Sequence, residues 1–360
     1  MKKSTVVIFL FAILPQGTLI AQTDPSDNAK SQIELDAQLL EAVEKADPNE
    51  IKVALEAGAN PNWTSDTLRK YSIIDALLWG LSERDKKHRC FQCLNLLFEA
   101  GGKLQPCDYA ILFTPIADGF PEIVELLIQK GASPTLKIEG MTPIEWAEAY
   151  GSKSVVDVLV MHGAKPVSSK EAAQLRFIHS AGRSFEKDGS FEQKNIIEME
   201  KALENGAAVD GQNSKGETAL VEAISCAYEL EEYITVVYLL QKGANPNLKS
   251  AQRFGGLDGI ALHHAVSFHG LMAEKGEDKT VYQKLIIEAL LNAGAHVSSR
   301  GYNGMTPLHI AAKNNDTYVA DILIKAGAKI MDRDDSGKTP LDYAESAEMI
   351  NLLKSHGAKE

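Results

Sequence analysis

Residues 304–325 read GMTPLHIAAKNNDTYVADILIK and are followed by an Ala-Gly-Ala triplet. A threonine before a proline is a strong helix start, because the Thr306 hydroxyl accepts a hydrogen bond from the first turn and Pro307 needs no donor there. The run KNND interrupts the apolar spacing, which then resumes until Gly327, a residue suited to a left-handed C-terminal cap. The stretch therefore predicts two short antiparallel helices.

The same pattern recurs along the chain. GMTPIEWAEAYGSKSVVDVLVMHGA begins at Gly140, GETALVEAI at Gly216 and GKTPLDYAESAEMINLLKSHGA at Gly337. The shorter units are about 30–33 residues long, a period typical of stacked helical repeats. An array of this kind grows by adding units and needs no single large core. The glycines expected to close the units are Gly58, Gly102, Gly131, Gly163, Gly206, Gly243, Gly294, Gly327 and Gly357.

The unit at Gly304 carries the complete motif G-x-T-P-L-H-x-A-A, and through this motif the chain resembles the ankyrin-repeat family. Two other units replace the histidine with Glu145 and Asp342, and the unit at Gly216 has Ala219 in place of the proline. Both acidic residues stand three positions after a threonine, which is capping-box spacing, so the helix start is expected to be kept. The motif residues expected to act structurally are Gly140, Thr142, Pro143, Gly216, Thr218, Gly304, Thr306, Pro307, His309, Gly337, Thr339 and Pro340.

The resemblance implies an all-α ankyrin-repeat solenoid, in which helix-turn-helix units with short hairpin turns are stacked. About nine units, including polar N- and C-terminal caps, are expected over residues 33–360. Residues 1–21 combine two lysines, a short apolar stretch and a final alanine, which is the pattern of a bacterial signal peptide. A flexible linker over residues 22–32 follows, so the mature chain is expected in the periplasm or outside the cell, without stable membrane insertion.

The balance of charge points to a protein partner. The chain has 37 Lys and Arg against 49 Asp and Glu, a net charge of −12, which disfavours nucleic acid and anionic membranes as partners. In the ankyrin family, turn tips and first helices line a concave groove that grips another protein. Aromatic and arginine side chains at the tips favour such contacts, and the predicted contact residues are Trp63, Leu136, Ile138, Arg253, Phe254, Arg300, Tyr302 and Arg333. An alternative is that some of them, Leu136 and Ile138 especially, pack on the neighbouring repeat.

Three units are longer than the others, and their extra residues fall between the first and second helices. The stretches are LSERDKKHR, AGRSFEKDGSFEQKN and HGLMAEKGEDKT, which start at residues 81, 181 and 269. Equivalent links line up along one edge of a solenoid, so the insertions are expected to form an irregular rim. The alternative is that they only lengthen helices and are solvated.

Few residues suggest chemistry. Cys90 and Cys93 form CFQC within an expected second helix, so they are either buried, joined in a disulfide with each other or with Cys107, or redox-active. Asp332 opens a segment that resembles a calcium loop but lacks its final glutamate, and a hairpin turn explains it. The nine histidines lack metal-ligand spacing, and no nucleophile, zinc-hydrolase or phosphate-loop motif is present. We therefore expect no enzyme activity, no metal and no cofactor.

The sequence thus predicts an exported, non-catalytic scaffold that binds a partner protein in its groove. One alternative is an immunity or inhibitor protein that occludes a toxin or hydrolase, which would bind tightly and one to one. Another is a redox or enzyme-assisting protein that uses Cys90 and Cys93, and this requires reactive thiols. The fold by itself does not select among these roles.

Overall fold

The computed structural model describes residues 31–65, 70–79, 87–106, 108, 110–138, 140–182, 191–225, 230–249, 260–267 and 280–359. The chain forms two compact units, Met1–Val167 and Ser168–Glu360, which we call unit 1 and unit 2 and describe separately. The predicted signal peptide, residues 1–21, lies outside the described residues. In the described part of the chain every regular element is helical, which confirms the predicted all-α class.

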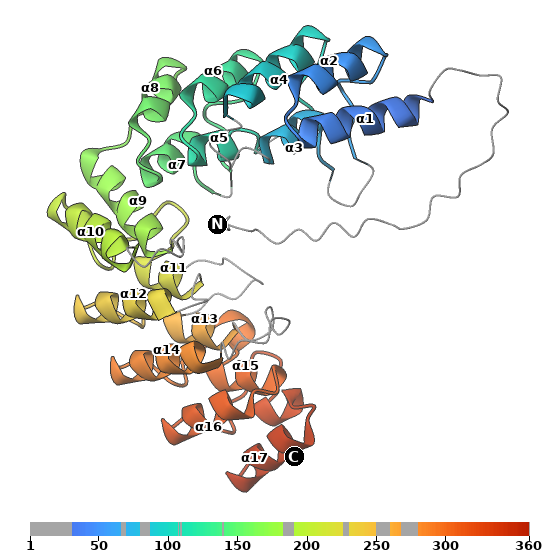
Figure 1. Ribbon diagram of the computed structural model, residues 1–360. Helices are drawn as coiled ribbons and strands as arrows, with labels where there is room; N and C mark the ends of the chain where they lie inside the picture. The colour runs from blue at the N-terminus through green and yellow to red at the C-terminus, as the bar shows by residue number, and fades with distance from the viewer. Residues whose placement is uncertain are drawn as a thin grey trace. The chain divides into compact units, whose positions relative to one another are not determined.

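Unit 1 contains four helical pairs. The first helices contact one another in chain order, and Figure 1 shows them in one row with the second helices in another. The first helices are α1 (Gln32–Glu44), α3 (Ile73–Trp79), α5 (Phe113–Ala117) and α7 (Pro143–Ala149). The second helices are α2 (Pro48–Glu56), α4 (Lys87–Glu99), α6 (Pro121–Gln129) and α8 (Lys153–Met161).

Unit 2 contains five pairs. Within this unit, too, the first helices form one row and the second helices another (Figure 1). Its first helices are α9 (Ser169–Ala181), α11 (Ala219–Ser225), α13 (Ala261–Ser267), α15 (Pro307–Lys313) and the 3-10 turn η5 (Pro340–Tyr343). Its second helices are α10 (Phe191–Glu204), α12 (Leu230–Gln241), α14 (Thr280–Asn292), α16 (Thr317–Lys325) and α17 (Ala347–Ser355). A further 3-10 turn, η4 (Tyr302–Gly304), lies in the hairpin before α15.

Apolar side chains between the two rows form the core of each unit. In unit 2 one continuous cluster extends from Phe177 to Ala358. Leu308 of α15 and Leu323 of α16 are both 0% exposed, so truncating either to alanine is expected to cost about 2–5 kcal/mol of stability. The predicted pair of antiparallel helices after Gly304 is confirmed, and its closing cap is in place, because Gly327 has a φ of 92°.

One predicted closing glycine is wrong. Gly101 has the left-handed φ, 90°, and its N–H donates to the Phe98 carbonyl as that of Gly58 donates to the Leu55 carbonyl. Gly102 occupies the position that alanine has in the other turns. The sequence could not separate the two glycines, because either can adopt a positive φ.

The extra residues of the long units fall where they were predicted, between first and second helices. Second helices have 9 residues in the short units, whereas α4, α10 and α14 have 13 or 14. Part of each insertion therefore lengthens a helix, as the alternative proposed. The rest of the three stretches lies outside the described residues.

The N-terminal boundary of the array is earlier than predicted. Ser31 caps α1 through a capping box with Glu34, and Gln32 is the first helical residue. The side-chain amide of Gln32 also donates to Asp36 Oδ1 and to the carbonyl oxygen of Gly58. The predicted linker over residues 22–32 is therefore wrong at its end, because residues 31 and 32 belong to the folded unit.

Candidate interaction surface

Capping boxes fix the start of four first helices, α1, α7, α15 and η5. In α7 the N–H of Thr142 donates to Glu145 Oε2 at 2.6 Å, and the Thr142 hydroxyl donates to the same oxygen at 2.8 Å. In η5 the N–H of Thr339 donates to Asp342 Oδ2 at 2.7 Å. The capping boxes predicted from the spacing are confirmed. Because Asp342 accepts from the threonine backbone and side chain, its pKa is held below the usual range.

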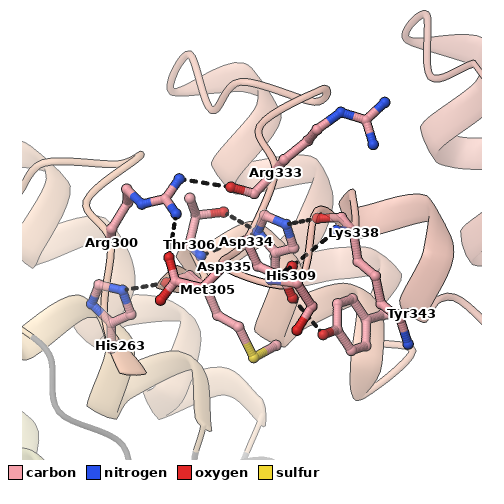
Figure 2. Close-up of polar contacts among 11 residues, drawn as sticks. His263, Arg300, Met305, Thr306, His309, Arg333, Asp334, Asp335, Lys338 and Tyr343 are labelled. Carbon is pink, nitrogen blue, oxygen red and sulfur yellow. Dashed lines mark hydrogen bonds and ion pairs between the residues drawn. The ribbon is translucent and has the colours of Figure 1, made fainter. Parts of the chain in front are cut away.

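In α15, His309 takes the place of the carboxylate in the capping box and also binds the next repeat. His309 Nδ1 accepts from the Thr306 N–H at 3.1 Å and lies 2.8 Å from its hydroxyl (Figure 2). Its Nε2 lies 3.0 Å from the carbonyl oxygen of Lys338, so the proton on Nε2 is donated there. His309 is 0% exposed, and burial lowers its pKa below 6.5, although the Lys338 carbonyl and nearby Asp334 and Asp332 oppose this.

His263 makes the second of these contacts, the one to the next repeat, one repeat earlier. It is 1% exposed, and its Nε2 lies 3.2 Å from the carbonyl oxygen of Met305, which precedes Thr306 as Lys338 precedes Thr339. Burial lowers its pKa as well. The predicted structural role of His263 and its equivalence with His309 are therefore confirmed. Within the described residues no three His, Cys, Asp or Glu side chains are grouped as a metal ion would require.

A second set of hydrogen bonds joins successive turns. Asn247 Oδ1 accepts from the His296 N–H at 2.7 Å, and its Nδ2 donates to the Gly294 carbonyl at 2.9 Å. Asn62 in unit 1 makes the equivalent pair with Lys103 and Gly101, at 2.9 and 3.1 Å. Each bond satisfies backbone groups at a helix end, so the turns are held in register.

The turn tips of unit 2 are fixed by arginine. Arg300 donates from Nη1 to the Arg333 carbonyl at 2.6 Å and pairs through Nη2 with Asp335 at 2.8 Å (Figure 2). Arg333 in turn donates from Nη1 to the Gly337 carbonyl at 2.6 Å. The bonds of Arg300 cross to the next turn, that of Arg333 stays within its own turn, and both arginines remain exposed.

The segment that resembles a calcium loop is a hairpin turn, as predicted. Asp334 Oδ1 accepts from the N–H groups of Ser336 and Lys338 at 2.8 and 2.9 Å. Its Oδ2 accepts from the Tyr343 hydroxyl at 2.5 Å, which raises the pKa of Tyr343 to about 12. The carboxylate is therefore used to order the turn.

The predicted contact residues differ in exposure. Leu136 is 48% exposed and Tyr302 is 43% exposed, whereas Trp63 is half-buried. Ile138 is 5% exposed, because it forms an antiparallel bridge with Met141, and the prediction that it contacts a partner is wrong. Its carbonyl also accepts from Trp146 Nε1 at 3.2 Å. Arg253 and Phe254 lie outside the described residues.

Unit 1 presents aromatic side chains that the sequence analysis did not group. Tyr71 lies between Trp63 and Trp79, with ring centroids 5.9 and 5.1 Å away. The chain has three tryptophans and all are in unit 1. The third, Trp146, packs edge-on against Phe113 at 5.0 Å between α7 and α5. Spacing along a helix does not link Tyr71 to Trp79, because α3 begins only at Ile73.

The two cysteines of CFQC are buried. Cys90 and Cys93 are 1% and 0% exposed in α4, as a second-helix position predicts, and both are free thiols. The predicted disulfide between them is therefore wrong, and Cys107 lies outside the described residues. Burial raises the pKa of each described thiol to about 12. Because the thiolate is the reactive form, redox chemistry has no support here.

Comparison with known proteins agrees with this geometry. Stacked helical pairs with Thr-Pro starts and left-handed glycine ends define a helical-repeat protein of the kind that binds other proteins. Residues 262–360 match the family model for ankyrin repeats (3 copies), so this C-terminal part of unit 2 consists of ankyrin repeats. No curated protein matches the chain. Among the described residues no helix is long and apolar enough to cross a membrane.

Proposed function

We propose that this chain is an exported, non-catalytic scaffold that binds a partner protein through its hairpin-turn tips and the exposed sides of its first helices. The observation that carries the proposal is the exposure of Arg300 and Tyr302 at one turn tip, where hydrogen bonds hold the Arg300 side chain. Arg300 is bonded to two groups of the next turn, and Tyr302 is 43% exposed in the adjoining η4. Side chains already held in place lose little freedom on binding, which favours affinity.

The experiment is affinity capture with the chain lacking residues 1–21, incubated with periplasmic extract of the source organism. One variant carries Arg300→Ala and Tyr302→Ala. A matched control carries Tyr318→Ala and Lys325→Ala, which are exposed residues of a second helix. We expect one protein to be captured by the parent and the control and to be at least about tenfold depleted with the turn variant, as hot-spot residues require.

Equal capture by all three proteins would refute the turn tips as the binding surface. No specific capture by the parent would refute the scaffold function itself. The captured protein also decides between scaffold and inhibitor, because an inhibited toxin or hydrolase would lose activity in the complex.

Export is tested on its own. Expressed in a bacterium, the full-length chain is expected to lose residues 1–21 and to fractionate with periplasmic or secreted proteins. Intact mass measurement of the purified chain reads out cleavage, and an uncleaved chain in the cytoplasm would refute export.

A further inference from the structure

We propose that unit 1 recognises a cationic side chain, arginine or lysine, of the partner protein on the aromatic cluster formed by Trp63, Tyr71 and Trp79. This inference rests on the proposed function and adds the chemistry of the partner and a second binding surface. A cation over an aromatic face is attracted by the negative charge distribution of the ring, and tryptophan is the best acceptor.

The cluster is built by a short antiparallel pairing. Ser65 N–H donates to the Tyr71 carbonyl at 2.9 Å, Ile73 N–H donates to the Trp63 carbonyl at 3.1 Å, and Thr64 pairs with Ser72. This backbone pairing sets Trp63 against Tyr71, and the Trp79 ring meets Tyr71 from the end of α3. Trp79 is 44% exposed, so part of the cluster faces solvent.

At least one carboxylate lies near these rings. Burial, together with the charge of Glu44 on α1, raises the pKa of Tyr71, which places that carboxylate within electrostatic reach of the phenol. Asp75 is in the first turn of α3, the helix that ends at Trp79. An aromatic surface beside carboxylates attracts cations by two mechanisms at once, ring electrostatics and charge pairing.

The whole region is acidic. Residues 31–65 and 70–79 contain eight Asp and Glu residues and three Lys residues, a net charge of 3 − 8 = −5. Two of the lysines, Lys45 and Lys52, are paired with glutamates. The described basic residues His88 and Arg89 belong to α4, in the other row of helices. A partner of opposite charge therefore fits this surface.

The chain itself uses the same pairing elsewhere. Lys284 Nζ lies 4.4 Å from the ring centroid of Tyr318, and Lys130 Nζ lies 5.1 Å from that of Phe98. Both contacts join successive repeats, α14 with α16 and α4 with α6. One exposed ring, that of Tyr318, and one buried ring, that of Phe98, thus accept ammonium groups within this protein.

The test uses three blocked seven-residue peptides in which arginine, citrulline or glutamate alternates with alanine. Citrulline has the shape of arginine without its charge, so it isolates the cation. Binding to the full chain lacking residues 1–21 is measured by calorimetry at physiological salt. We expect the arginine peptide to bind about tenfold more tightly than the citrulline peptide, and the glutamate peptide not to bind.

Two variants locate the site. Trp79→Ala and Glu44→Gln are each expected to weaken binding of the arginine peptide about three- to tenfold. Glu345→Gln is the matched control, because it removes the same charge from an exposed position in unit 2 and should leave binding unchanged. Circular dichroism verifies that each variant is folded, and Glu44→Gln changes only an exposed side chain.

The inference fails if the citrulline or glutamate peptide binds as well as the arginine peptide. It also fails if Glu44→Gln behaves like Glu345→Gln, or if no arginine-peptide binding is found up to millimolar concentration. These results leave the proposed function standing when the periplasmic capture still yields a partner. A capture that yields no partner refutes the proposed function even if the peptide binds.

Discussion

Helices α7 in unit 1 and α15 in unit 2 begin with the same Thr-Pro pair but complete their caps with different side chains. Glu145 only accepts, whereas His309 accepts from Thr306 and donates to Lys338 of the next repeat. An ionised carboxylate has no proton to give, so it cannot make the second bond. The histidine thus joins two repeats where the glutamate stabilises one helix.

The surfaces of the two units differ as well. Unit 1 groups Trp63 and Trp79 with Tyr71, and unit 2 places arginines and Tyr302 at its turn tips. The backbone pattern beneath both is the same. We therefore expect binding specificity to depend on a few exposed residues, with the repeat as their support.

The largest expected effect comes from removing the two capping side chains, one in each unit. His309→Ala removes the acceptor of Thr306, the donor to Lys338 and a fully buried ring, and is expected to lower the free energy of unfolding of unit 2 by about 3 kcal/mol. Glu145→Ala removes a cap alone and should cost unit 1 about 1 kcal/mol.

Urea unfolding can separate the two units, because all tryptophans are in unit 1. Tryptophan fluorescence then follows unit 1, and circular dichroism follows both. His309→Ala should shift the dichroism transition more than the fluorescence transition, and Lys313→Ala, an exposed control in the same helix, should shift neither. If His309→Ala costs no more than Glu145→Ala, the second bond of the histidine is unimportant.

The turn-joining asparagines test what the two units share. Asn247→Ala leaves the His296 N–H and the Gly294 carbonyl without their partners, and Asn62→Ala does the same to Lys103 and Gly101. Each change is expected to cost about 1–2 kcal/mol, with equal effects in the two units. The same two transitions measure it, with Asn351→Ala as an exposed control. Unequal losses would show that the joints are not equivalent.

A lower pH is expected to destabilise α15, which has a histidine cap, more than α7. The folded-state pKa of His309 lies below 6.5, so the unfolded chain binds the proton more readily. Stability at α15 is therefore expected to fall as pH drops from 6.5 towards the folded-state pKa, and to be constant above that window. Protonated Nδ1 no longer accepts from Thr306, whereas the cap of α7 contains no histidine.

Amide exchange, corrected for its intrinsic pH dependence, provides the measurement. Protection in α15 should decrease between pH 7.5 and 5.5, and protection in α7 should not. His263, which is buried in the same way, is expected to make α13 behave like α15. Equal changes in α7 and α15 would contradict the assignment of the effect to the histidines.

The sequence predicted the features that depend on local spacing. The capping box joins Thr142 to Glu145, three positions later, and its hydrogen bonds follow from helix geometry alone. The equivalence of His263 and His309 followed in the same way from the repeat alignment. The place of the insertions followed because each lies between two recognisable helices.

Contacts across a turn could not be predicted from the sequence. Ile138 is buried because it pairs with Met141 and accepts from Trp146, and its apolar character alone did not separate this from exposure. The cluster around Tyr71 forms because the backbone pairing brings in Trp63 and the end of α3 brings in Trp79. Such meetings depend on the fold, and single-residue properties do not encode them.

The smallest expected effect concerns the arginine at the turn tip. Arg300→Ala removes an exposed ion pair whose side chains are 51% and 65% exposed, and solvent screening limits its contribution to about 0.5 kcal/mol. The dichroism transition in urea should therefore hardly move, and Asp335→Ala should give the same result, alone or combined with Arg300→Ala. A loss above about 1.5 kcal/mol would make Arg300 a structural residue of the turn, since exposed pairs do not contribute so much. A small loss of stability together with a large loss of partner capture would separate binding from folding at this one position, which no cap or core residue of the chain allows.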